Sequence, residues 1–137
     1  MVGISLIFIG CFMNFFGKAV SDVVDNTPVW EKSIFSNLVS EKTDFFGPKD
    51  ETWIRKRHPN KLLKFLLSTI FVSLTDVWHL GNLVRHSGVY ISILGALLCS
   101  LMIEFSLEFI LLLMGGYIGL TLIGFHTFYH YILRKTI

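Results

Sequence analysis

The chain has 137 residues, of which 53% are hydrophobic and 16% are charged, and its formal net charge at pH 7 is +2. About a quarter of the residues of a soluble domain are charged, so this composition excludes an ordinary soluble domain and favours a single membrane domain over residues 1–137. The small net charge, with no basic stripe interleaved with aromatic residues, argues against nucleic-acid binding.

The first predicted helix covers residues 2–25 and begins with the apolar run Val2–Phe16. No charge precedes this run and no small-residue cleavage pattern follows it, so we expect a retained membrane helix rather than a cleaved signal peptide. Cys11 and Cys99 both sit inside apolar runs. We interpret them as small residues at membrane depth and not as a disulfide framework.

A polar segment follows at residues 26–60, with all three prolines and many aromatic side chains. Apolar residues recur at helical spacing in it, at Trp30, Ile34, Phe35 and Leu38. This pattern predicts a short amphipathic helix that lies on the bilayer surface or against the bundle ends, or a folded loop packed on the helices. The basic cluster at the end of the segment is expected to contact anionic lipid headgroups through Arg55, Lys56, Arg57 and Lys61.

Three further membrane helices are predicted, at residues 61–80, 89–104 and 107–133. The charge-free stretch Phe65–Thr75 is short for a span of about 20 residues, so the second predicted helix is extended through Trp78 to Leu80. Between Val89 and Leu133 the only charges are Glu104 and Glu108. We place the break between helices there, because a carboxylate at the bilayer centre costs about 2.5–3.5 kcal/mol. The predicted fold is an all-α integral membrane bundle of about four transmembrane helices with a short amphipathic cytoplasmic segment.

Orientation and helix packing follow from two further patterns. Nine of the twelve Lys and Arg lie between Lys18 and Lys64, which predicts a cytoplasmic segment 26–60 and, with four spans, both termini outside. Small residues recur on one face of each of the last two predicted helices, at Ser92, Ala96 and Ser100 and at Gly115 and Gly119. Such faces let membrane helices approach closely, so we expect a tight hairpin of these two helices, with self-association as the competing use.

Several short motifs, in this order, resemble a family of small multi-pass membrane proteins of bacteria, of the Bacteroidota type, which has no established activity. The matching positions are Ser33–Phe35, Pro48, Trp53, Lys56, Thr75, Asp76, Trp78, His79, Tyr129, Ile132, Leu133 and Lys135. The chain departs from the family pattern at Phe46, Gly47 and Thr52, and lacks the aromatic–histidine pair that members often have before the first motif. The resemblance implies a membrane architecture and a bacterial membrane location, and it implies no chemistry.

The candidate site is a cluster of polar residues at the predicted helix ends: Asp76, His79, Arg85, His126 and His130. His126 and His130 are four residues apart, a spacing that can ligate a metal. With His79 and Asp76 they supply a zinc or iron ligand set, or two axial histidines for haem. The simpler interpretation is an interfacial belt of aromatic residues and histidines that holds no cofactor.

Other enzyme classes lack sequence support. The chain has too few histidines for a membrane di-iron desaturase, and it has no G-x-S-x-G, phosphate-binding glycine loop or C-x-x-C. We therefore predict a non-catalytic subunit, scaffold or oligomeric pore of a bacterial inner membrane. Its expected partners are the lipid bilayer and either further copies of the chain or a larger membrane complex. The alternative is a small intramembrane enzyme or transport protein that handles a metal or protons through Asp76, His79, His126 and His130.

Overall fold

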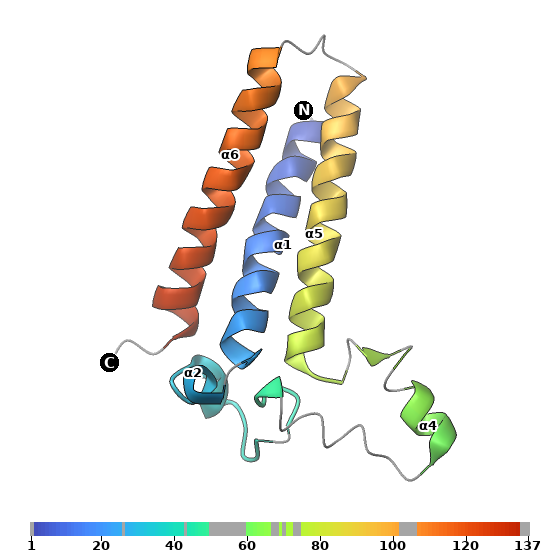
Figure 1. The fold of residues 1–137 in the computed structure, drawn as a ribbon, viewed down its shortest axis with the longest axis vertical. Coiled ribbons are helices and arrows are strands. Elements are labelled where there is room, and N and C mark those ends of the chain that lie inside the picture. The colour runs from blue at the N-terminus through green and yellow to red at the C-terminus, as the bar shows by residue number, and fades with distance from the viewer. Residues whose placement is uncertain are drawn as a thin grey trace.

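The computed structural model describes residues 2–25, 27–42, 44–49, 60–66, 69, 71–72, 75–101 and 107–134. Three long helices lie side by side in these residues: α1 (Val2–Asp25), α5 (Val77–Ser100) and α6 (Leu107–His126), with α1 between the other two (Figure 1). The π-helical segment η5 (Thr127–Leu133) extends α6 by seven residues. By length and composition three helices qualify as membrane spans in the described residues, the third covering Glu108–Leu133.

The middle of the chain differs from the sequence prediction. The predicted helices at residues 2–25 and 107–133 coincide with α1 and with α6 plus η5. The predicted helix 61–80 is wrong: α4 (Lys61–Phe65) has five residues, and Asp76 is extended, with φ −159° and ψ 158°. A single helix, α5, begins at Val77 and replaces the prediction of a helix over 89–104. Asp76 is a strong helix-starting residue, and Gly81 and Gly88, which follow the predicted end of the helix at residue 80, are buried inside α5.

Glycines hold α1 and α5 in backbone-to-backbone contact. Each helix has a glycine every seven residues, which places the three on one face, and the antiparallel helices pair them as Gly3–Gly95, Gly10–Gly88 and Gly17–Gly81. A Cβ on Gly81, Gly88 or Gly95 would lie 2.9, 2.5 or 2.6 Å from the carbonyl oxygen of its partner glycine. The sequence analysis missed this series, although its spacing is visible in the sequence.

The predicted hairpin of small residues between the last two helices is wrong. Ser92 is buried, but it faces α1, because its Oγ donates to the Gly88 carbonyl at 3.0 Å and lies 3.5 Å from that of Ile7. Ala96 and Ser100 are exposed. A Cβ on Gly115, Gly116 or Gly119 would meet nothing within 4 Å. The predicted contact between the small residues of α5 and α6 does not form because α1, and not α6, packs along α5.

Residues 27–42 and 44–49, which we call the base segment, pack against one end of the bundle. They contain α2 (Thr27–Glu31) and η1 (Ile34–Asn37). Trp30 and Phe35 are buried there, and the Trp30 indole donates to the Phe46 carbonyl at 2.6 Å. The segment therefore packs against the bundle end, partly as the short helices α2 and η1, with Ile34 and Leu38 exposed.

The hydrophobic core of the described residues lies at this same end. It joins the last turns of α1, the base segment, the start of α5 and the end of η5 through Ala19, Val20, Val23, Val24, Trp30, Phe35, Val77 and Leu133. An isolated antiparallel β-bridge between Ser33 and Arg134 ties the base segment to the end of η5. The helices are thus anchored to one another where the polar segment meets them.

The two ends of the described chain lie at opposite ends of the bundle (Figure 1). The start of α1 lies at the end away from the base segment, and the end of η5 lies beside α2 (Figure 1). The prediction of both termini outside depended on four spans, and the described residues contain three helices that qualify as spans, so it stays a prediction.

Candidate functional site

Asp76 is the most buried member of the predicted cluster, with 2% of its surface exposed. A turn precedes it, in which the Thr75 hydroxyl donates to the Val72 carbonyl at 2.7 Å. Asp76 then starts α5: its Oδ1 accepts the backbone N–H of His79 at 2.9 Å. This is the geometry of a helix N-cap, in which a side-chain oxygen binds an amide that has no partner within the helix.

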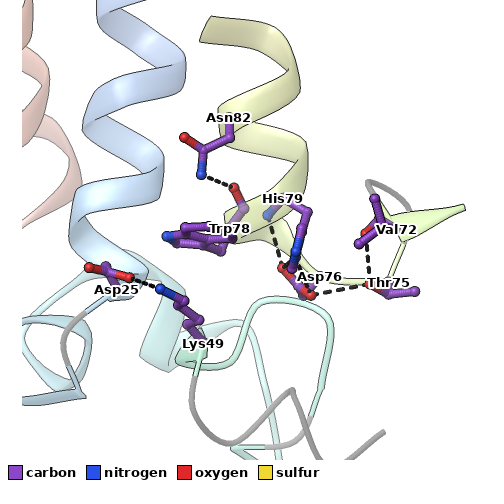
Figure 2. A network of polar contacts seen from close by, with 8 residues as sticks. All are labelled: Asp25, Lys49, Val72, Thr75, Asp76, Trp78, His79 and Asn82. Atoms are coloured by element: carbon purple, nitrogen blue, oxygen red, sulfur yellow. Dashed lines mark hydrogen bonds and ion pairs between the residues drawn. The ribbon is translucent and has the colours of Figure 1, made fainter. Parts of the chain in front are cut away.

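The same carboxylate binds the imidazole of His79 (Figure 2). The Nδ1 atom of His79 lies 2.8 Å from both Oδ1 and Oδ2, and the Thr75 hydroxyl lies 3.2 Å from Oδ2. The His79 side chain is 20% exposed. The pairing of Asp76 with His79 three residues later therefore has a structural cause, because the N-cap carboxylate lies beside the side chain of the third helical residue.

A second polar contact joins the base segment to two helices. The ammonium of Lys49 lies 4.1 Å from the centre of the Trp78 ring and 2.8 Å from Oδ1 of Asp25 (Figure 2). The backbone N–H of Val77 donates to the Phe45 carbonyl at 2.9 Å nearby. These contacts were missed by the sequence analysis, because Asp25, Lys49 and Trp78 lie far apart along the chain.

The two histidines of the last helix do not join this pair. His126 and His130 are exposed, and their rings stack with centres 5.5 Å apart and planes 9° apart. The neighbouring residues Phe125 and Tyr129 stack on each other and pack on the core. Within the described part of the chain, no three His, Cys, Asp or Glu side chains lie close enough to share a metal ion.

The remaining predicted residues fall into separate positions. Arg85 is half-buried two turns beyond His79 and lies on the α1 contact, where a Cβ on Gly17 would come within 2.5 Å of its backbone nitrogen. Lys61 is exposed at the start of α4. Arg55, Lys56 and Arg57 lie outside the described residues.

Polar side chains also connect α1 to α6 at membrane depth. Asn14 Nδ2 donates to the Tyr117 hydroxyl at 2.8 Å, and Cys11 Sγ lies 3.4 Å from the Thr121 hydroxyl. Hydrogen bonds of this kind stabilise helix pairs in lipid, where water does not compete for the polar groups. They account for the attachment of α6 to α1 despite the few buried residues on α6.

An apolar groove of about 270 Å³ runs between α5 and α6, over α1. Ile7 forms part of its lining, together with Ala96, Met114 and Tyr117. The Tyr117 hydroxyl is already hydrogen-bonded to Asn14. The groove therefore presents a hydrocarbon-like surface with no pair of groups suited to acid–base chemistry.

Comparisons with protein-family models, with curated proteins and with solved structures find no match.

Proposed function

We propose that the protein is a non-catalytic scaffold or subunit of a bacterial inner membrane, in which a three-helix bundle holds the base segment at the cytoplasmic surface. The arrangement of the candidate ligands carries this proposal. Asp76 and His79 satisfy each other at the start of α5, whereas His126 and His130 are exposed on the last helix. A metal- or proton-handling site would require these four side chains to converge.

The distribution of positive charge supports the cytoplasmic placement. α1 ends, α5 begins and η5 ends at the bundle end that carries the base segment (Figure 1). All twelve Lys and Arg belong to that end by sequence: Lys18 and Arg85 are in the nearer halves of α1 and α5, and the others lie between these helices or after Leu133. Positively charged segments remain in the cytoplasm. The bacterial membrane location is further supported by the sequence resemblance described above.

The exposed apolar residues of the base segment supply the surface for a partner protein. Ile34 and Leu38 are 38% and 61% exposed beside the buried Trp30 and Phe35. They point away from the core, although the segment is otherwise folded onto it. Scattered apolar residues are normal on surfaces, so the test must identify what contacts Leu38 in the native membrane.

A photo-crosslinking amino acid at Leu38 tests the proposal in intact native membranes. We expect the probe at Leu38 to crosslink to one protein and to give a discrete adduct. No protein adduct should form when the probe instead replaces Leu112, which is 71% exposed on the lipid-facing side of α6. The scaffold role would be contradicted if the probe at Leu38 gave no protein adduct while the probe at Leu112 gave lipid adducts. The lipid adducts would show that the probe reacts.

Elemental analysis of the purified protein tests the alternative function. The scaffold predicts metal well below one equivalent, and no change in His126→Ala. About one equivalent of zinc or iron in the wild type, lost in both Asp76→Asn and His126→Ala, would contradict it and favour the metal-handling site, because a single closed site binds one ion.

A further inference from the structure

The short helix α4 has no buried residue. Leu62, Leu63 and Phe65 are 67%, 38% and 54% exposed, and Lys61 and Lys64 are also exposed. α4 lies to the side of the bundle, beyond the start of α5 (Figure 1). Its side chains therefore present an apolar and basic surface next to the end of a membrane helix.

Two apolar side chains of α4 lie opposite its two lysines. At about 100° per residue, Lys61 and Lys64 share one face, Leu62 and Leu63 share the opposite one, and Phe65 lies between Lys61 and Leu62. This separation is the pattern of helices that lie in the membrane interface, with apolar residues toward the acyl chains and lysines among the headgroups.

The length of α4 also gives it little stability of its own. Isolated helices shorter than about 12–15 residues are marginal in water, and α4 has five residues. Its start is specified locally, because the Asn60 side chain accepts the N–H groups of Leu62 and Leu63 at 2.9 and 3.2 Å. Such a helix is stabilised when its apolar face is buried.

The surroundings identify the surface that buries it. α4 lies beside the bundle end at which α1 ends and α5 begins (Figure 1). The residues of α4 contain two lysines and no acid, which complements the negative charge of anionic lipids. A bilayer surface is already present at this level for a chain that spans the membrane.

We propose that α4 is an interfacial anchor, which inserts Leu62 and Leu63 into the cytoplasmic leaflet and binds anionic lipid headgroups through Lys61 and Lys64. The inference rests on the membrane-spanning bundle and does not depend on the scaffold role. A purified protein in vesicles tests it without any partner protein, so its failure is distinct from that of the scaffold proposal.

A fluorescent label at one introduced cysteine measures whether α4 is in lipid. The background carries Cys11→Ala and Cys99→Ala, and the label is placed through Leu63→Cys in vesicles of phosphatidylglycerol and phosphatidylcholine. We expect strong quenching by nitroxide lipids and weak quenching by iodide. Ser40→Cys, exposed in the base segment, is the matched water-side control, and Leu112→Cys is the lipid-side control.

The charge contribution is tested with the double variant Lys61→Gln, Lys64→Gln. Each lysine near an anionic surface raises the partitioning of a segment onto the bilayer about fivefold. Loss of both lysines should therefore lower the ratio of lipid-quenched to iodide-quenched label about 25-fold in anionic vesicles. In pure phosphatidylcholine the double variant should match the parent.

Two results would overturn the proposal. A Leu63 label quenched by iodide as strongly as the Ser40 label in anionic vesicles would show that α4 lies in water. Equal lipid quenching of parent and double variant in anionic vesicles would show that the lysines do not bind headgroups. Circular dichroism of each labelled protein verifies that the bundle is folded.

Discussion

Asp76 both caps α5 and binds the imidazole of His79, so one buried carboxylate satisfies two donors of His79 at the start of a membrane helix. The Thr75 hydroxyl, which donates to Val72, lies 3.2 Å from the same carboxylate. Burial of an unpaired carboxylate is costly, and hydrogen bonds to it recover that cost. The pair therefore fixes where α5 begins, and this fixes which residues of the chain enter the membrane.

Substitution of Asp76 separates capping from charge. Asp76→Ala should destabilise the protein by about 2–4 kcal/mol, because the cap is lost and buried donors are left unpaired. Asp76→Asn should cost less than about 1.5 kcal/mol, because Asn caps helices well and neutral His79 can accept from the new amide. Unfolding in detergent measures both. Equal losses would show that the carboxylate charge, and not the cap, is what stabilises α5.

The hydrogen bond from Asn14 to Tyr117 is the second residue-level device, because it joins α1 to α6 within the membrane. Tyr117→Phe and Asn14→Leu, with the double variant, form a cycle that isolates it. The expected coupling free energy is about 0.5–1.7 kcal/mol, the range seen for hydrogen bonds between membrane helices. Additive losses would show that the two side chains do not interact.

At the scale of the helices, glycines decide which pairs pack. The six glycines of the α1–α5 contact permit backbone approach along its length, whereas Gly115, Gly116 and Gly119 of α6 meet open space. In lipid, helix association depends on van der Waals packing and hydrogen bonds and not on the exclusion of water. The closeness that glycine allows is therefore a main source of stability for α1 and α5.

Two glycine variants make a matched pair. Gly88→Ala places a Cβ 2.5 Å from the Gly10 carbonyl oxygen, so the helices must separate, at an expected cost of about 1–3 kcal/mol or more. Gly116→Ala meets nothing within 4 Å and should be neutral or stabilising by up to about 1 kcal/mol, since Ala favours helix. Unfolding in detergent distinguishes them. A similar loss in both would mean that the glycines act through helix flexibility and not through close approach.

At the scale of the whole molecule, the base segment closes one end of the bundle with an aromatic core, and the far end lacks such a layer in the described residues. The core includes Trp30 and Phe35 of the base segment and Leu133 of η5, which come from two distant parts of the chain. The β-bridge between Ser33 and Arg134 adds a backbone link at the same place. One end of the molecule is therefore polar, basic and anchored.

Three spans predict termini on opposite sides of the membrane. In intact cells a cysteine at Ser40 should resist a membrane-impermeant thiol reagent, as should one at Arg134, and both should react after permeabilisation. A cysteine at Val2, at the other end of α1, should react in intact cells because it lies outside. Protection of the Val2 position together with labelling at Ser40 would reverse the orientation, and the same response at Val2 and Arg134 would contradict three spans.

The sequence by itself determined the properties that depend on local composition and spacing. The length of the apolar runs identifies α1 and α6, and the clustering of Lys and Arg identifies the polar end. Asp76 and His79 are three positions apart, so their proximity on a helix is also visible in the sequence. Each of these signals lies within one segment. The predicted helix boundaries failed around Asp76 and between residues 81 and 88, because hydropathy alone does not show that Asp76 caps a helix or that Gly81 and Gly88 lie inside one.

Only the tertiary structure decided which faces meet. The seven-residue glycine series is visible in each of two segments, but its meaning depends on α1 and α5 running antiparallel in register, with Gly10 against Gly88. The same holds for His126 and His130, whose helical spacing suits a metal but whose exposed face carries no third ligand in the described residues. Contacts between residues distant along the chain depend on packing geometry, and neither periodicity nor composition encodes that geometry within a single segment.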